Sequence, residues 1–142
     1  MTVDHQKELL LKGYIENMIY RFMIVQNRFL QKSAAGLSMS ELRIISFIGD
    51  NKRCIMREIS ESLLIPKTNL TAIMNKLVRK EIVSRERTEE DRRMVYVGLT
   101  ESGDELYRQI MSSHLELSRG MLEALDESEQ DDMFKILGKI AR

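Results

Sequence analysis

Two runs of side chains in this sequence could contact nucleic acid. The first follows Pro66 and presents amide, hydroxyl and cationic groups on one side of a predicted helix: Lys67, Thr68, Asn69, Thr71, Asn75, Lys76 and Arg79. Such groups can hydrogen-bond base edges and phosphates in the major groove, and Asn is suited to adenine. The second run is rich in arginine and consists of Arg85, Arg87, Asp91, Arg92 and Arg93. At the tip of a hairpin, a cationic side chain could enter the electronegative minor groove.

The alternative interpretation of both runs is a solvated polar surface. Which interpretation holds depends on the helices and strands that carry these residues. Hydrophobic periodicity predicts a first helix from about residue 4 to residue 32. Its apolar residues recur in alternating steps of four and three: Leu11, Ile15, Met18, Phe22, Val25 and Phe29. Further apolar residues widen this stripe, so we expect part of it to face a second subunit, with an ordinary core helix as the alternative.

Three short helices are predicted next. Ser38 and Glu41 have the spacing of a capping box, which begins a helix that ends near Gly49. A second helix covers residues 56–63. Pro66 is expected in the first turn of the third helix, because its missing N–H costs nothing there, and this helix runs to residue 80. Its apolar side directs four residues inward: Leu70, Ile73, Met74 and Leu77.

A β-hairpin and two further helices follow. Apolar and charged residues alternate over 83–87 and 95–99, and the segment between them, 88–93, is polar. Thr100 offers an N-cap for a second long helix. Its apolar stripe consists of Leu106, Ile110, Leu117, Met121 and Leu125. The last helix is expected to begin near Asp126 or Ser128 and to bury Met133, Phe134, Ile136, Leu137 and Ile140.

Charge is distributed unevenly along the chain. The 142 residues carry 22 basic and 22 acidic side chains and therefore no net charge, which excludes indiscriminate attraction to nucleic acid or anionic membranes. Residues 1–51 nevertheless have a balance of +1, residues 52–93 of +4 and residues 94–142 of −5. Positive charge is thus concentrated where the short helices and the hairpin are predicted, as contact with phosphates requires.

The hairpin carries a specific motif. Asp91, Arg93, Leu99 and Thr100 stand in the spacing D-x-R-x5-L-T, followed by Glu101, Ser102 and Gly103. This motif closely resembles the wing signature of the MarR family of bacterial transcriptional regulators. The order of elements, the length and the segment Leu77–Arg85 are also similar to that family. The resemblance implies a mainly α (α+β) fold, a winged helix-turn-helix with one β-hairpin wing and long dimerisation helices at both ends.

The resemblance also implies a domain organisation and a function. A single domain over 1–142 would dimerise through residues 1–35 and 104–142 and bind DNA through residues 36–103. The protein would act as a homodimeric, cytoplasmic repressor of transcription on a pseudo-palindromic operator. Its release would depend on a small amphipathic or anionic effector. Within the motif, Arg93 would reach the DNA, while Asp91 would hold the tip through a carboxylate–guanidinium interaction.

Two positions depart from the family pattern. Many members have Ser where this chain has Pro66, so the usual side-chain cap is absent from the third short helix, which corresponds to the recognition helix of the family. Many also have Gly where this chain has Glu81. Because Gly adopts the left-handed conformation more easily than Glu, we expect the turn into the wing to be built differently.

Other chemistries have little support in the sequence. Two histidines and one cysteine leave few metal ligands, and no nucleophile elbow, phosphate loop or zinc motif occurs, so we expect no enzyme activity, no cofactor and no metal. Cys54 is either a buried small hydrophobic residue or, next to Arg53 and Arg57, a redox-sensing thiol. His114 is expected to pack in the core or at an interface. The remaining alternative is a winged-helix dimer that binds protein instead of DNA.

Overall fold

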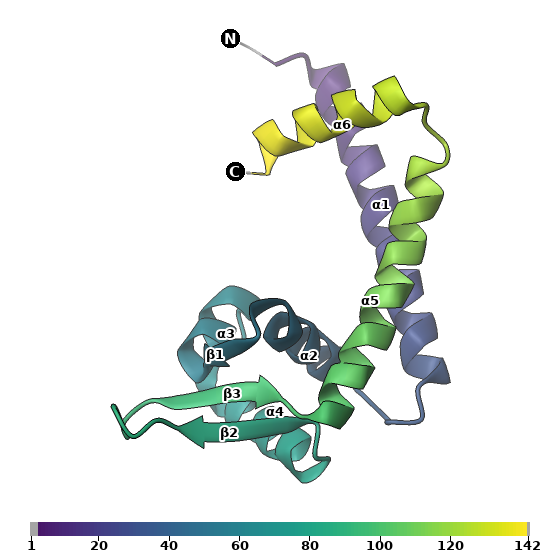
Figure 1. The fold of residues 1–142 in the computed structure, drawn as a ribbon. Coiled ribbons are helices and arrows are strands. Elements are labelled where there is room, and N and C mark those ends of the chain that lie inside the picture. Colours follow the sequence, from purple (N-terminus) through teal and green to yellow (C-terminus); the bar gives the residue numbers. More distant parts are fainter. Residues whose placement is uncertain (1–2, 142) are drawn as a thin grey trace. The chain divides into compact units, whose positions relative to one another are not determined.

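The computed structural model describes residues 3–141 and is mainly helical (Figure 1). The N-terminal half contains α1 (His5–Lys32), α2 (Met39–Asn51), β1 (Arg53–Ile55), α3 (Met56–Leu63) and α4 (Lys67–Arg79). The hairpin strands β2 (Val83–Arg87) and β3 (Val95–Leu99) follow, and then α5 (Glu101–Leu122) and α6 (Glu127–Ile140). All predicted helices and the hairpin are confirmed. None of the helices within 3–141 combines the length and hydrophobicity that a membrane span needs.

The chain divides into two compact units. The middle unit is Gln26–Met111, and the end unit consists of the described residues up to Val25 together with those from Ser112 onward. The division falls within α1 and within α5, so each of these helices contributes residues to both units.

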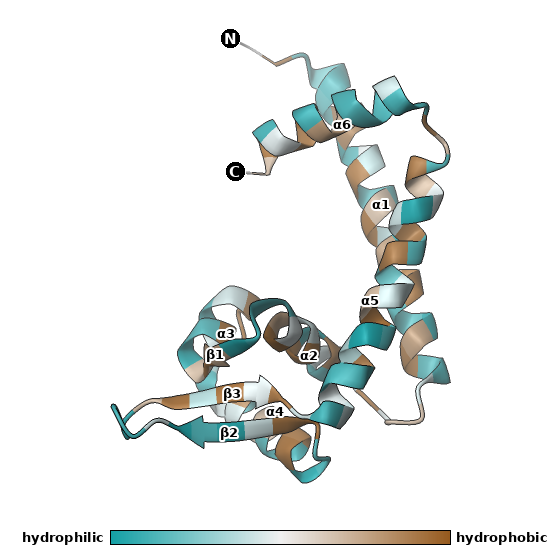
Figure 2. Ribbon diagram, in the orientation of Figure 1, coloured by the Kyte–Doolittle hydropathy of each residue, from teal (hydrophilic) through white to brown (hydrophobic). Residues whose placement is uncertain are grey.

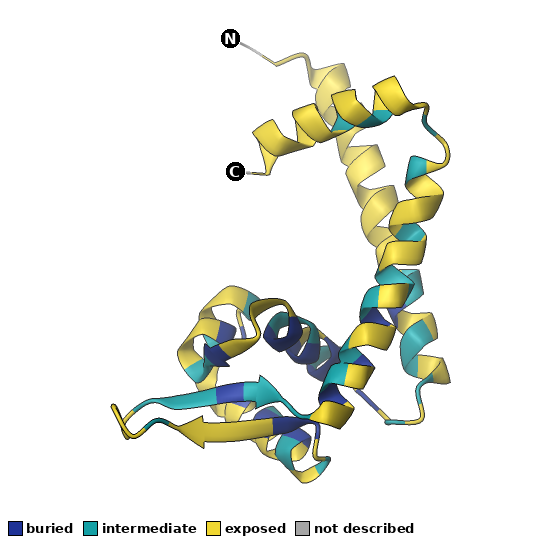
Figure 3. Cartoon of the chain, in the orientation of Figure 1, coloured by how far each residue is buried: buried dark blue, intermediate teal, exposed yellow. Residues whose placement is uncertain are grey.

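The middle unit contains the hydrophobic core. Helix α2 contributes Leu42, Ile44, Ile45 and Ile48, and α4 contributes Leu70, Met74 and Leu77, all of them at most 1% exposed. In Figure 3 these buried stretches appear dark blue along α2 and α4. The inward side predicted for the third short helix is therefore confirmed, with Ile73 half-buried beside the core. The core buries one side of α4, and the opposite side of this helix is exposed to solvent.

The three-stranded antiparallel sheet has the order β1-β3-β2. In the hairpin Val83 pairs with Leu99 and Arg87 with Val95, while on the other side of β3 Cys54 pairs with Val97. Strand β1 was not predicted, because three residues are too few to display an alternating pattern. Its pairing fixes the base of the wing to the segment between α2 and α3.

Two helix starts differ in how they are capped. The predicted capping box is confirmed at α2, where the Glu41 backbone N–H donates to Ser38 Oγ over 3.1 Å and the Ser38 N–H donates to Glu41 Oε2 over 2.8 Å. Pro66 is the N-cap of α4 and does not lie in its first turn. As expected from its chemistry, it supplies no side-chain cap, although its carbonyl accepts a hydrogen bond from the Leu70 N–H.

The end unit lacks a core of its own. Every buried residue of the described chain lies between Gln26 and Ile110, and α6 contains none. The burial predicted for α6 is therefore wrong for the single chain: Phe134, Ile136, Leu137 and Ile140 are all exposed. These side chains have the predicted helical spacing, but the chain itself supplies no surface that covers them. Figure 2 shows apolar segments in α1 and α6, and Figure 3 shows that most of these two helices is exposed.

Candidate nucleic-acid interface

Helix α4 presents its predicted polar residues to solvent. All seven are exposed: Lys67, Thr68, Asn69, Thr71, Asn75, Lys76 and Arg79. The Thr71 hydroxyl donates to the Lys67 carbonyl over 2.9 Å, so its proton is engaged within the helix and its oxygen is left as an acceptor. This face can therefore offer amides, ammonium groups and a guanidinium to a nucleic acid, while the opposite face remains in the core.

A buried carboxylate anchors the C-terminal end of α4. Glu41 is 1% exposed, and its carboxylate lies 3.3 Å from Lys80 Nζ and 3.9 Å from Lys76 Nζ. Lys80 Nζ also donates to the Gly36 carbonyl over 3.2 Å. Burial of a carboxylate is costly unless cations and N–H groups surround it, and here the Ser38 N–H and two lysines do so. The contact ties α4 to the start of α2.

The turn from α4 into the wing keeps the left-handed conformation. Glu81 has φ 58°, so the expectation of a differently built turn is wrong. Thr100 Oγ1 donates to the Glu81 carbonyl over 2.5 Å and accepts from the Gly103 N–H over 3.0 Å. These bonds, together with the Thr100 N–H to the Ile82 carbonyl, hold the turn in a conformation that a non-glycine residue rarely adopts.

The wing tip is held by hydrogen bonds from backbone N–H groups to side-chain oxygens. The Asp91 carboxylate accepts from the Arg93 backbone N–H over 3.0 Å, and the Asp91 N–H donates to Thr88 Oγ1 over 3.3 Å. The predicted carboxylate–guanidinium interaction is therefore wrong, because Asp91 reaches the backbone of Arg93 and not its guanidinium. Within 3–141, no carboxylate lies at ion-pair distance from Arg85, Arg87, Arg92 or Arg93. These four cations thus remain available to an anionic partner.

One hydrogen bond joins the two predicted sets of residues. Arg85 Nη2, on β2, donates to Asn75 Oδ1, on α4, over 2.7 Å. Next to this bond lies a hollow of about 490 Å³, lined by Met56, Thr71, Arg85, Arg87 and Val95. Figure 2 shows that β2 and the hairpin tip are mostly hydrophilic. The Arg85–Asn75 bond therefore joins the polar side of α4 to the cationic strand of the wing.

Arg53 also supports the wing, although the sequence did not identify it in this role. Its guanidinium carbon lies 3.8 Å from the centre of the Tyr96 ring, so β1 and β3 are held together by a cation–π contact as well as by backbone pairing. Recognising Arg53 would have required the pairing of β1 with β3.

Cys54 fits the structural interpretation better than the redox one. It is 2% exposed, and burial, together with the nearby Glu58 carboxylate, raises the pKa of its thiol from 9.0 to about 11. The thiolate is the reactive form, so this environment opposes oxidation.

The ring of His114 lies 4.7 Å from that of Phe22 in the end unit, in agreement with a packing role. Among residues 3–141 no group of three or more His, Cys, Asp or Glu side chains could hold a metal ion.

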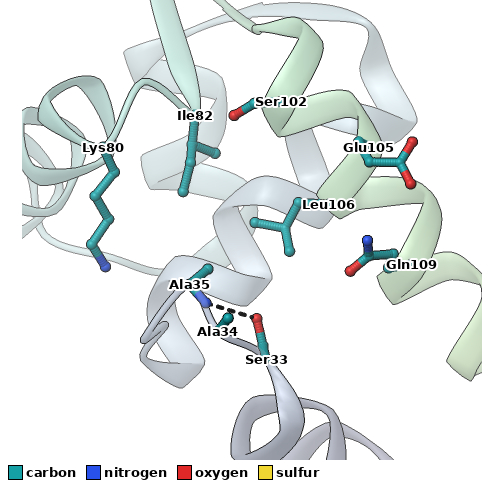
Figure 4. A pocket seen from close by; sticks show the side chains of 9 residues that line it. All are labelled: Ser33, Ala34, Ala35, Lys80, Ile82, Ser102, Glu105, Leu106 and Gln109. Atoms are coloured by element: carbon teal, nitrogen blue, oxygen red, sulfur yellow. Dashed lines mark hydrogen bonds between the residues drawn. The ribbon is translucent and has the colours of Figure 1, made fainter.

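A cavity of about 440 Å³ opens in the middle unit, where the segment after α1 meets the start of α5 (Figure 4). Its walls combine apolar side chains with polar and charged ones: Ser33, Ala34, Ala35, Lys80, Ile82, Ser102, Glu105, Leu106 and Gln109. Lys80 belongs both to this wall and to the Glu41 anchor of α4. The sequence did not point to this cavity, because its lining comes from three separate segments of the chain.

Comparisons with known proteins agree with this geometry. The profile of the MarR family matches residues 35–94, the part that contains α2, the helix-turn-helix and the start of the wing. The HTH-type transcriptional regulator YfiV of Bacillus subtilis is 28% identical over 107 residues, which are 75% of this chain and 66% of YfiV.

Two solved structures share the fold. Streptococcus pneumoniae FabT, solved in complex with DNA, has a TM-score of 0.81 and 24% identity, covering 97% of this chain and 95% of FabT. Bordetella bronchiseptica BpsR, whose DNA binding is regulated by 6-hydroxynicotinic acid, has a TM-score of 0.66 and 14% identity, covering 94% of this chain and 99% of BpsR. The fold, the wing motif and the profile match over residues 35–94 agree, so this chain is a winged helix-turn-helix protein that is similar to the MarR family of regulators.

Proposed function

We propose that this protein is a sequence-specific, DNA-binding transcriptional regulator that represses transcription from a pseudo-palindromic operator. The observation that carries the proposal is the joined surface of α4 and the wing, where Arg85 contacts Asn75 and the wing arginines have no acidic partner within 3–141. The excess of four positive charges over residues 52–93 supports contact with phosphates. FabT, with the same fold, was solved with DNA.

The regulator acts as a homodimer, with residues 1–35 and 104–142 providing the dimerisation helices and residues 36–103 the DNA-binding lobe. All exposed large hydrophobic side chains of the described chain, apart from Leu64, belong to the end unit. A helical unit with many exposed apolar residues and none buried needs a partner surface. A second copy supplies one by symmetry, and it also supplies a second recognition helix.

A small amphipathic or anionic molecule in the cavity beside Lys80 relieves repression. Ile82 and Leu106 offer apolar contact, and Lys80 offers a cation. An anion that drew Lys80 away from Glu41 would loosen the anchor at the end of α4. The regulation of BpsR by 6-hydroxynicotinic acid supports this kind of control.

We further propose that the protein has no enzyme activity and no cofactor, and that it works in the cytoplasm. Its relatives are transcriptional regulators, and regulation of transcription requires access to the genome. The single cysteine is compatible with a reducing compartment.

Selection of bound sequences from random DNA tests the proposal. We expect an enriched motif with two-fold symmetry and half-sites about 10 bp apart, because a symmetric dimer places its two recognition helices one helical turn apart. Failure to enrich any motif, with only weak and salt-sensitive binding, would reject sequence-specific regulation and favour the protein-binding alternative.

The wing is tested by Arg93→Ala. Loss of a phosphate contact should weaken operator binding and reduce the slope of log affinity against log salt by about 0.9. Arg108→Ala is the matched control, since it removes the same charge from a side chain that already pairs with Asp104 and Glu105. An Arg93→Ala protein that is folded and binds with wild-type affinity and slope would exclude the wing role.

A further inference from the structure

The hydrogen bond between Arg85 and Asn75 determines which groups Asn75 can offer to a base. A guanidinium carries only N–H donors, so the atom of Asn75 that faces it over 2.7 Å must be the amide oxygen. The assignment of oxygen and nitrogen in the Asn75 amide therefore follows from the identity of its neighbour. The amide NH2 group is left with both of its donors.

This arrangement disfavours the contact that Asn usually makes with adenine. In that contact the amide oxygen accepts from adenine N6 while the amide nitrogen donates to N7. Here the oxygen already accepts from a cation, and a positive charge next to it repels the hydrogens of the adenine amino group. Guanine presents two acceptors, N7 and O6, at the same place in the major groove. Both are attracted to N–H donors and to positive charge.

We propose that Asn75 and Arg85 act as one donor-presenting unit that selects guanine, and not adenine, at one position in each half-site. The inference rests on the proposed function, because it concerns the base preference of the same surface. Asn75 contributes its NH2 donors, and Arg85 contributes its remaining N–H donors and its charge. Arg85 is exposed and has no carboxylate partner within 3–141, so its charge is not neutralised before DNA arrives.

The contact also fixes the recognition helix relative to the wing. Asn75 lies one turn after Thr71 on α4, and Arg85 lies on β2 beside the hollow that Thr71, Arg87 and Val95 line. Holding both side chains in place before binding reduces the conformational entropy lost in the complex. Substitution of either residue should therefore affect both the affinity and the base preference.

The test is selection from random DNA with the wild-type protein and with Arg85→Ala, Asn75→Asp and Arg87→Ala, all at about 50 mM salt so that weakened variants still bind. The wild-type motif should contain one guanine in each half-site that depends on this pair. Arg85→Ala frees the amide oxygen, so adenine should replace guanine there, with a change in relative preference of about tenfold. Asn75→Asp still accepts from Arg85 but loses the amide donors, so preference for this guanine should fall by about tenfold.

Arg87→Ala is the control for a general loss of charge. It removes a cation from the same strand two residues further on, and it should weaken binding at all sequences without altering the motif. The inference is overturned if Arg85→Ala and Asn75→Asp leave the motif unchanged, or if they only weaken binding as Arg87→Ala does. A wild-type protein that enriches no motif would instead remove the proposed function, so the two failures are distinguishable.

Discussion

Thr100 shows how a single side chain can position several parts of the interface. Its hydroxyl donates to the carbonyl that follows the recognition helix, at Glu81, and accepts from the Gly103 N–H at the start of α5. The wing ends and α5 begins at this residue. The Leu-Thr pair of the wing motif therefore has a structural role. Thr100 holds the left-handed turn at Glu81, and Leu99 pairs with Val83 at the start of β2.

Cys54 provides a pH test of its burial. The thiol of the unfolded chain ionises near its ordinary pKa of 9.0, whereas that of the folded protein ionises near 11. The folded pKa is raised, so the contribution to stability is complete below pH 9 and is lost as the pH rises toward 11. We expect the free energy of unfolding to fall by about 2–3 kcal/mol more in the wild type than in Cys54→Ala over this range.

Denaturant unfolding at pH 8, 9, 10 and 11 measures this difference. Tyr107, whose pKa is raised to about 12 chiefly by its hydrogen bond to Asp50, titrates in both proteins and so cancels in the comparison. Parallel pH profiles for the two proteins would mean that the Cys54 thiol ionises as readily in the folded as in the unfolded chain. The redox interpretation would then regain support.

At the scale of elements, close packing between the start of α5 and Ile82, which lies between α4 and β2, can be tested with two glycines of α5. A Cβ at Gly103 would overlap the Ile82 carbonyl oxygen, which belongs to the backbone and cannot easily move. Gly103→Ala should therefore destabilise the protein by about 1–3 kcal/mol and displace the wing base. At Gly120 a Cβ meets nothing within 4 Å. Gly120→Ala should be neutral or stabilise by up to about 1 kcal/mol.

Thermal unfolding of both variants checks this pair of predictions. Equal changes in Tm would show that helix propensity alone governs the substitutions and that α5 does not press against Ile82. Operator affinity offers a second measurement, since only Gly103→Ala should change the position of the wing.

The elements were predictable from the sequence where a local pattern specifies them. Periodicity located the helices, and Ser38 with Glu41 marked the start of α2 correctly. Contacts between distant segments were not predictable in this way. Strand β1 forms only because β3 pairs with it, and the bond from Arg85 to Asn75 depends on how β2 crosses α4. For Asp91, the sequence predicted a role in the wing tip but not the group that it contacts. The backbone N–H and the guanidinium belong to the same residue, Arg93, so sequence spacing cannot distinguish between them.

At the scale of the whole molecule, the zero net charge conceals a separation of charge along the chain. The segment 52–93, with its balance of +4, contains α3, α4 and the first strand and tip of the wing. The segment 94–142, with its balance of −5, contains β3 and all of α5 and α6. Such a molecule is attracted to DNA through one surface and repelled through another. This distribution favours one orientation and limits non-specific binding.

The oligomeric state also belongs to the scale of the whole molecule, and a substitution at Ile19 tests whether α1 forms the dimer interface. Ile19 lies on α1 in the end unit and is 54% exposed. It is one of the apolar residues that widen the stripe of α1, which we assign to the dimer interface. Ile19→Glu should place a charge in that interface, and a buried unpaired carboxylate is expensive enough to shift the protein toward monomer at micromolar concentration. Sedimentation velocity gives the oligomeric state. The affinity for a full operator should also fall, because one molecule no longer binds both half-sites together.

Leu64→Glu is the matched control. Leu64 is 88% exposed and is the one exposed large hydrophobic side chain of the described residues outside the end unit. It carries the same change in charge and polarity, yet it should leave the protein dimeric. If both variants remain dimers, the apolar residues of α1 do not form the interface. If both become monomers, added charge alone explains the loss. Only dissociation of Ile19→Glu by itself supports the end unit as the surface that a second copy covers.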